Sequence, residues 1–146
     1  MSARRAWLRG AAGLLAVSCV PVAAADAGRM AAEVARFAGG AGVRAGRVRI
    51  EVPELVDNGN SVPIEVEVDA PVNADSHVRR IAVFNEKNPQ PNVAVFHLGP
   101  RAGRARVGTR IRLADSQRIV AVAELSDGSF WSAAADVVVA LAACLE

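Results

Sequence analysis

Apolar and polar residues alternate with a period of two along most of the chain after position 47. The cleanest stretch covers residues 104–113, where Val107, Thr109 and Ile111 alternate with arginine and glycine. Residues 62–69 repeat the pattern with valine and isoleucine against acidic residues. A period of two is that of a strand with one buried face and one solvated face. The chain is therefore constrained to fold mainly into sheets.

Turn signals divide this region into about seven strands. Asn58-Gly59 and Asp127-Gly128 are dipeptides typical of tight turns, and residues 53–60 as a whole are expected to form a turn. We find no alternation of strands with helices of the kind that builds parallel sheets. An all-β, immunoglobulin-like antiparallel β-sandwich is expected, with a small barrel as the alternative. The expected strands are residues 47–52, 62–69, 78–85, 93–98, 104–113, 117–125 and 130–141.

A short helix is predicted before the strands, at residues 29–37. Its spacing places Met30, Val34 and Phe37 on one face, and three glycines between positions 39 and 42 follow it. Within the last strand, we expect either Phe130 or Trp131 to lie in the core.

The first 25 residues have the pattern of a secretory signal. Arg4 and Arg5 precede an apolar stretch at 10–22, and small residues continue to Ala25. The stretch is shorter than the roughly 20 residues that span a bilayer, and paired arginines are typical of a Tat signal. We expect cleavage after Ala25 and a periplasmic location. The predicted organisation is residues 1–25 (signal), 26–46 (short helix and linker), 47–141 (sandwich) and 142–146 (arm).

Removal of the signal changes the charge of the chain. The 17 basic residues lose Arg4, Arg5 and Arg9, which leaves 14 against 15 acidic residues and a net charge near −1. This balance argues against nucleic acid as a partner. No other apolar run approaches the length of a membrane span, so no membrane association is expected.

The cysteines point to a reactive position. Cys19 lies in the predicted signal, where a loose likeness to a lipoprotein box is a disfavoured alternative, and Cys144 is left unpaired. An unpaired thiol in an oxidising compartment favours reactive use or intermolecular pairing, although free cysteine is also common in cores. Cys144 follows the last predicted strand in the sequence Ala142, Ala143, Cys144, Leu145, Glu146. Extended residues of about 3.3 Å each could carry its sulfur about 10 Å beyond the sheet.

Other residues give weaker indications of chemistry. His77 and His97 are the two histidines, and with one terminal cysteine they do not supply the spacing of a zinc site; no metal is expected. Motifs of hydrolases and phosphate-binding loops are absent, so no intrinsic catalysis is predicted. A row of arginines is interpreted as a solvated strand face rather than an anion dock. The row consists of Arg104, Arg106, Arg110 and Arg112.

Eight short segments lie along the predicted mature chain: GRV at 46–48, VPE at 52–54, DNGNSVP at 57–63, VEVDAP at 66–71, NEKNP at 85–89, VFH at 95–97, TRIRLA at 109–114 and VAVAELSDG at 120–128. Together they resemble the SoxY family of sulfur-oxidation carrier proteins, over essentially the whole predicted mature chain. The resemblance implies a periplasmic immunoglobulin-like sandwich that forms a heterodimer with a SoxZ-like subunit. It implies that Cys144, on a carboxy-terminal arm, holds thiosulfate-derived sulfur covalently while periplasmic sulfur-oxidation enzymes act on this cargo; no other cofactor is implied.

The arm departs from the common family pattern. SoxY arms end in Gly-Gly-Cys-Gly-Gly, whereas this chain ends in AACLE and is similar to a SoxY-related branch with an AACIE arm. Alanine admits fewer backbone conformations than glycine, so a stiffer arm is expected. Leu145 adds an apolar contact, and the negative charge of Glu146 disfavours the thiolate of Cys144. A docked partner or an oxidant is therefore expected to assist loading.

Two hypotheses follow. The first is a non-catalytic periplasmic carrier of sulfur on Cys144. The second is a binding or regulatory module whose arm docks in a partner or whose cysteine forms an interchain disulfide.

Overall fold

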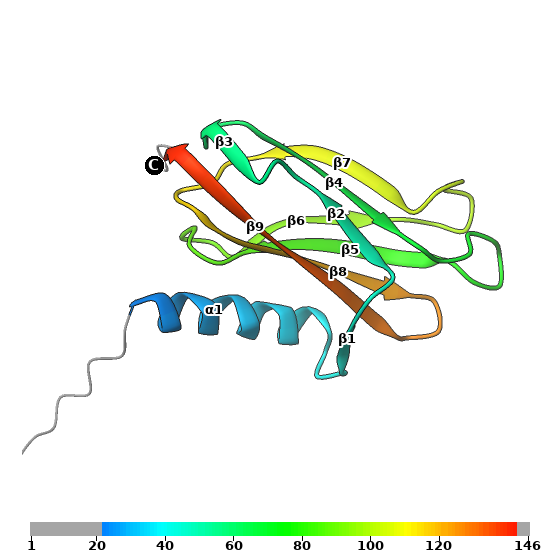
Figure 1. Ribbon diagram of the computed structural model, residues 1–146. Helices are drawn as coiled ribbons and strands as arrows, with labels where there is room; N and C mark the ends of the chain where they lie inside the picture. Colours follow the sequence, from blue (N-terminus) through cyan, green and yellow to red (C-terminus); the bar gives the residue numbers. More distant parts are fainter. Residues whose placement is uncertain (1–21, 143–146) are drawn as a thin grey trace, which may run out of the picture.

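A computed structural model describes residues 22–142, which form one helix and nine strands (Figure 1). The strands lie in two sheets. The larger has the order β1-β9-β8-β5-β6, with β3 also paired to β9, and the smaller has the order β2-β4-β7. No helix in these residues combines the length and apolar character needed to cross a bilayer. The elements are α1 Val22–Phe37, β1 Val43–Ala45, β2 Val48–Glu51, β3 Leu55–Asn58, β4 Val62–Val68, β5 Val78–Asn85, β6 Asn92–His97, β7 Arg106–Ile111, β8 Gln117–Leu125 and β9 Phe130–Leu141.

The main core lies between the two sheets. In β4 the residues at even positions are buried and those at odd positions are exposed or half-buried, as the period of two predicts. The large sheet contributes side chains from β5, β8 and β9 to the same layer. Burial of these aliphatic side chains is the main stabilising contribution to such a sandwich. Its members include Val62, Ile64, Val66, Ile81, Val83, Leu113, Ile119, Val137 and Val139.

A second core lies between α1 and the outer face of the large sheet (Figure 1). Phe37 packs edge to face on Phe84 and Phe130, with ring centroids 5.9 and 6.0 Å apart. Met30 is buried and Val34 packs beside it, so the predicted apolar helix face is confirmed. Because α1 covers this face, β5 is buried on both faces from Ile81 to Asn85.

The fold class is confirmed, with three differences in detail. Residues 53–60, expected as a turn, contain strand β3. Both β1 and β3 pair with β9 in parallel, so the large sheet is mixed rather than purely antiparallel. These strands have three and four residues, too few for periodicity to indicate them, and the edge of β9 holds them in place. The helix also begins at Val22 rather than 29, because alanine-rich residues extend it toward the amino terminus. The predicted cleavage after Ala25 falls within this helix and stays a prediction.

The chain crosses from the large sheet to the small one between β1 and β2. Gly46 and Arg47 both have positive φ, at 119° and 58°, and the Gly46 N–H donates to the Ser132 carbonyl at 3.0 Å. The guanidinium carbons of Arg44 and Arg47 lie 4.5 and 4.7 Å from the centroid of the Trp131 ring. A left-handed conformation costs an arginine about 1–2 kcal/mol, and the cation–π contacts help to offset this cost. Trp131 is half-buried here, whereas Phe130 lies in the helix-side core, so one of the pair is core as expected.

Phe37→Ala should destabilise the fold, because it removes both edge-to-face aromatic contacts and the ring beneath the Arg80 guanidinium. We expect a loss of about 2–4 kcal/mol in the free energy of unfolding, measured by urea denaturation with circular dichroism. Leu55→Ala, at an exposed side chain, is the control and should change stability by less than about 0.5 kcal/mol. Equal effects of the two variants would show that α1 does not contribute to the folded core.

Candidate functional site

Strand β9 leads the chain to the predicted arm at one end of the sandwich (Figure 1). Two hydrogen bonds fix this end from opposite sides. The Val139 N–H donates at 2.9 Å to the side-chain oxygen of Ser116, the residue immediately before β8. The Gly59 N–H donates to the Leu141 carbonyl at 2.8 Å, just beyond β3. The root of the arm is therefore held on both edges.

Strand β3 extends this anchoring along the outer edge of β9. Leu55 is paired with Val138 and Asn58 with Leu141, and the Val138 N–H donates to the Glu54 carbonyl at 2.8 Å. Val56 and Val139 are paired and both face the inter-sheet core. Because successive strand residues point to opposite faces, Leu55 and Val138 lie together on the outer face.

A buried polar network holds the segment that carries Ser116. The Asn88 side-chain amide donates to the Arg112 carbonyl at 2.8 Å, and the Gln117 amide donates to Asn88 Oδ1 at 2.9 Å. Gln117 Oε1 accepts the Lys87 N–H at 2.9 Å. Buried amides with satisfied partners fix loop geometry, since breaking one bond would leave a buried polar group unpaired. The loop between β7 and β8 is thus tied to the end of β5.

Charged groups near the root are arranged in pairs. Arg118 donates two hydrogen bonds to the Asp136 carboxylate, at 2.9 and 3.1 Å, and this contact lowers the pKa of Asp136. The Ser116 backbone N–H, followed by Lys87, lowers the pKa of Asp115. Both carboxylates are therefore ionised at neutral pH. Because both carboxylates are exposed to solvent, each ion pair makes only a small contribution to stability.

Cys144 lies outside the described residues, together with Ala143, Leu145 and Glu146. The last described residue, Ala142, is exposed. Chain geometry limits the Cα of Cys144 to about 7 Å from that of Ala142. The fold thus fixes the strand end that precedes Cys144 in the sequence.

The other residues singled out in the sequence do not gather into a site. His97 ends the edge strand β6 and is exposed, and His77 is half-buried before β5. Within residues 22–142, no group of three or more histidine, cysteine or acidic residues is placed to hold a metal ion.

The row of arginines is solvated, as expected. Arg106 and Arg110 lie in β7, whereas Arg104 and Arg112 flank that strand, and all four are exposed. Arg106 forms an ion pair with Glu65 on the neighbouring strand β4. Cross-strand pairing of opposite charges accounts for Arg106, and Arg110 donates to the Ser61 hydroxyl at 3.2 Å.

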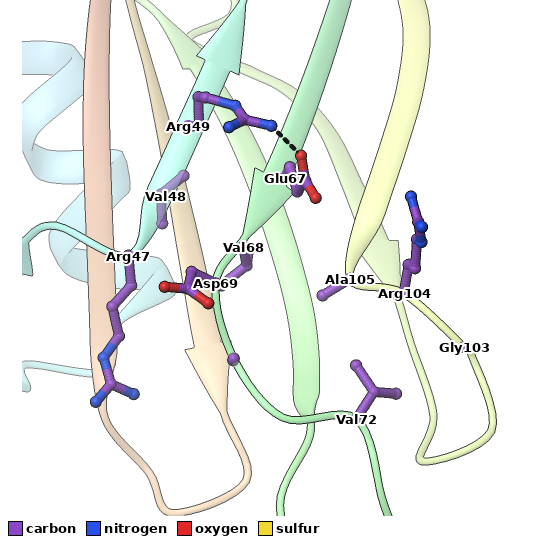
Figure 2. A pocket seen from close by; sticks show the side chains of 11 residues that line it. Arg47, Val48, Arg49, Glu67, Val68, Asp69, Val72, Gly103, Arg104 and Ala105 are labelled. Carbon is purple, nitrogen blue, oxygen red and sulfur yellow. Dashed lines mark hydrogen bonds and ion pairs between the residues drawn. The ribbon is translucent and has the colours of Figure 1, made fainter.

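Figure 2 shows a surface hollow of about 630 Å³ at the opposite end of the small sheet. Arg49 is paired with Glu67 across its rim. The side chains of Arg47 and Arg104 extend in opposite directions (Figure 2), and the Asp69 carboxylate lies between them. The arginine side chains that line the hollow do not point toward one common position, so the hollow does not have the arrangement of a small-anion site.

Sequence reasoning missed the residues that fix the arm root. Ser116 and Leu55 lie in segments expected as loop and turn, and Gly59 was identified only as part of a turn dipeptide. The adjacent apolar pair Leu55-Val56 inside an otherwise polar segment was the available signal.

Comparisons with known proteins identify a matching family and proteins with a similar fold. A family model described as "Sulfur oxidation protein SoxY" matches residues 34–144, a range that ends at the arm cysteine. The sulfur carrier protein SoxY from Chlorobium limicola f thiosulfatophilum is 27% identical; the match covers 77% of this chain and 97% of that chain, with a TM-score of 0.66. No curated protein matches the chain.

Superoxide reductases share the fold. The neelaredoxin from Ignicoccus hospitalis is 21% identical, with coverage of 64% of this chain and 80% of that chain and a TM-score of 0.58. The putative enzyme from Thermotoga maritima is 24% identical, with coverage of 66% and 86% and a TM-score of 0.55. At this identity the likeness extends to architecture alone.

The fold and the family match define a β-sandwich carrier protein of sulfur oxidation. The chain belongs to the SoxY family.

Ser116→Ala should loosen the arm root, because the Val139 N–H loses its acceptor. We expect the Val139 amide to exchange with solvent at least about fivefold faster, corresponding to about 1 kcal/mol, measured by hydrogen–deuterium exchange. Ser129→Ala is the matched control, since that hydroxyl accepts from the Trp131 ring N–H at the far end of β9. Equal protection of Val139 in both variants would contradict the anchoring role.

Asp136→Asn should reduce the decrease in the free energy of unfolding that occurs as the pH falls below about 4. Arg118 lowers the pKa of Asp136 in the folded state, so the folded chain binds fewer protons than the unfolded chain as pH falls below about 4. The stabilisation is present above the unfolded pKa and is lost as pH falls through the folded pKa. Urea midpoints between pH 2 and 6 measure it, and Arg118→Gln should reproduce the effect. A wild-type acid limb in both variants would contradict the assignment.

Proposed function

We propose that this chain is a periplasmic carrier that holds a sulfur species covalently on Cys144 and presents it to partner enzymes. The observation that carries the proposal is the family match through residue 144, combined with a strand whose end is fixed on both edges just before the arm. A fixed base and a short tether deliver the sulfur to a narrow region of space. The chain itself catalyses nothing.

The cargo is a thiosulfate-derived group. The Cys144 thiolate and thiosulfate form a sulfur–sulfur bond to give the S-thiosulfonate, and two electrons pass to a haem-bearing acceptor on a loading enzyme. The proton of the thiol is released to solvent. Persulfide is the alternative cargo. Glu146 places negative charge near the thiol and disfavours the thiolate, so the loading enzyme supplies positive charge or oxidising power.

The working unit is a heterodimer with a SoxZ-like subunit, and a Tat-type signal exports the chain. The family supports partnership with other sulfur-oxidation proteins. The signal, the heterodimer and the arm chemistry are parts of the proposal.

Intact mass spectrometry of protein from thiosulfate-grown cells, prepared without reductant, tests this function. We expect a sulfur adduct that reductant removes and that Cys144→Ser abolishes, together with sulfur-oxidation activity. Ala143→Ser is the matched control, since it adds a hydroxyl beside the cysteine and keeps the thiol; it should retain the adduct. The absence of any adduct on Cys144 would contradict carriage.

The second hypothesis, a docking module, predicts a different result for the same variant. The exposed apolar side chains of Leu55 and Leu141 at the arm root favour it. Cys144→Ser would then still assemble with its partner and support function, whereas a carrier loses all activity.

A further inference from the structure

The most exposed large apolar side chains of residues 22–142 gather at the root of the arm. Leu55, Val138 and Leu141 are 63%, 55% and 66% exposed. Strand pairing brings Leu55 and Val138 together on the outer face of the large sheet, because the two residues are in register. Leu141 alternates in step with Val137 and Val139, so it belongs to the opposite face of β9. We name Leu55 and Val138 the arm-root patch.

The patch belongs to the outer face of the large sheet, which α1 covers elsewhere. Phe130, at the start of β9, packs against the helix. Val138, eight residues further along the strand, is more than half exposed. The sheet thus leaves apolar surface open near the end of β9, a few residues before Cys144 in the sequence. Exposed apolar groups that cluster mark interaction surfaces more often than single exposed ones.

Charge around the patch selects the kind of partner. Glu54 and Asp57 flank Leu55 and are exposed. Within the described part of the chain, neither carboxylate forms an ion pair, whereas Asp136 and Asp115 nearby are paired. An apolar centre with an uncompensated acidic rim complements an apolar surface flanked by lysine or arginine. A second copy of the patch would bring like charges together, which disfavours self-association.

The size of the patch fits a transient contact. A stable interface uses about 20–30 residues on each side, far more than two apolar side chains and two acids. A partner that loads or unloads the arm must approach its root and then leave. A small apolar centre with a charged rim gives fast association with modest affinity.

We propose that the arm-root patch is the docking surface for an enzyme that acts on the arm, through an apolar spot flanked by basic residues on that enzyme. This inference rests on the proposed function, since it assigns the surface by which a carrier meets its enzymes.

The test compares two routes for loading Cys144, followed by intact mass. The enzymatic route uses thiosulfate with a periplasmic extract from cells that lack the chromosomal copy. The chemical route uses tetrathionate: the thiolate attacks an inner sulfur, forms the S-thiosulfonate and releases thiosulfate. The chemical route needs no docking and therefore reports thiol accessibility alone.

The double variant Leu55→Ser, Val138→Ser should load at least about tenfold more slowly in extract at low carrier concentration, and at the wild-type rate with tetrathionate. Val95→Ser is the matched control, because Val95 is 37% exposed on the far edge strand β6 of the same sheet. It should match wild type by both routes. Equal enzymatic rates for all three proteins would overturn the docking surface.

The acidic rim is tested separately, with a variant expected to keep the fold. Glu54→Gln with Asp57→Asn should slow enzymatic loading and remove most of its dependence on salt concentration, since screening acts on the same charges. An unchanged salt dependence would overturn the charge complementarity that defines the partner.

Crosslinking separates failure of docking from failure of carriage. A photoreactive phenylalanine at position 138, in the Cys144→Ser background, should crosslink the full-length chain to a protein in the extract, and the same residue at position 95 should not. Wild-type carrier should compete, and the Leu55→Ser, Val138→Ser variant should not. With this pattern but no sulfur on wild-type Cys144, docking would stand and carriage would fall. A crosslink to a second copy, or within the chain, would overturn docking.

Discussion

The pairing of β9 on both of its edges is the constraint on which the structure depends. This strand of 12 residues pairs antiparallel with β8 along one edge and in parallel with β1 and β3 along the other. It also joins the two cores, since Val137 and Val139 face the small sheet and Phe130 faces the helix. If β9 lay at the edge of its sheet, the backbone N–H and C=O groups on one side would lack a partner strand, and the end of the strand could fray. With both edges occupied, the end of β9 is a fixed point.

The fixed end of β9 matters for a carrier protein because it determines where the following residues begin. A carrier must keep its attachment point accessible and present it in a reproducible place. Here Ser116 and Gly59 hold the end of the strand in place, a few residues before Cys144 in the sequence.

The outer face of the small sheet and the arm root differ in how their charged side chains are paired. The outer face of the small sheet carries cross-strand pairs, such as Arg49 with Glu67 and Arg106 with Glu65, and these keep it solvated. At the arm root, Glu54 and Asp57 lie beside exposed leucine and valine. The small sheet therefore carries charges that are partly paired across its strands, whereas the exposed acids at the arm root form no ion pair among the described residues.

The sequence by itself determined the sandwich class, most strand positions, the apolar face of α1 and the place of Cys144 behind the last strand. Each depends on local periodicity, turn chemistry or order along the chain, which nearby residues specify. The tertiary structure decided the parallel strands β1 and β3, the cover of the large sheet by α1 and the anchoring of Leu141 by Gly59. These depend on contacts between residues such as Leu55 and Val138, which lie far apart in sequence. A strand of three or four residues has too short a period to be detected, and it becomes stable only when a distant edge pairs with it.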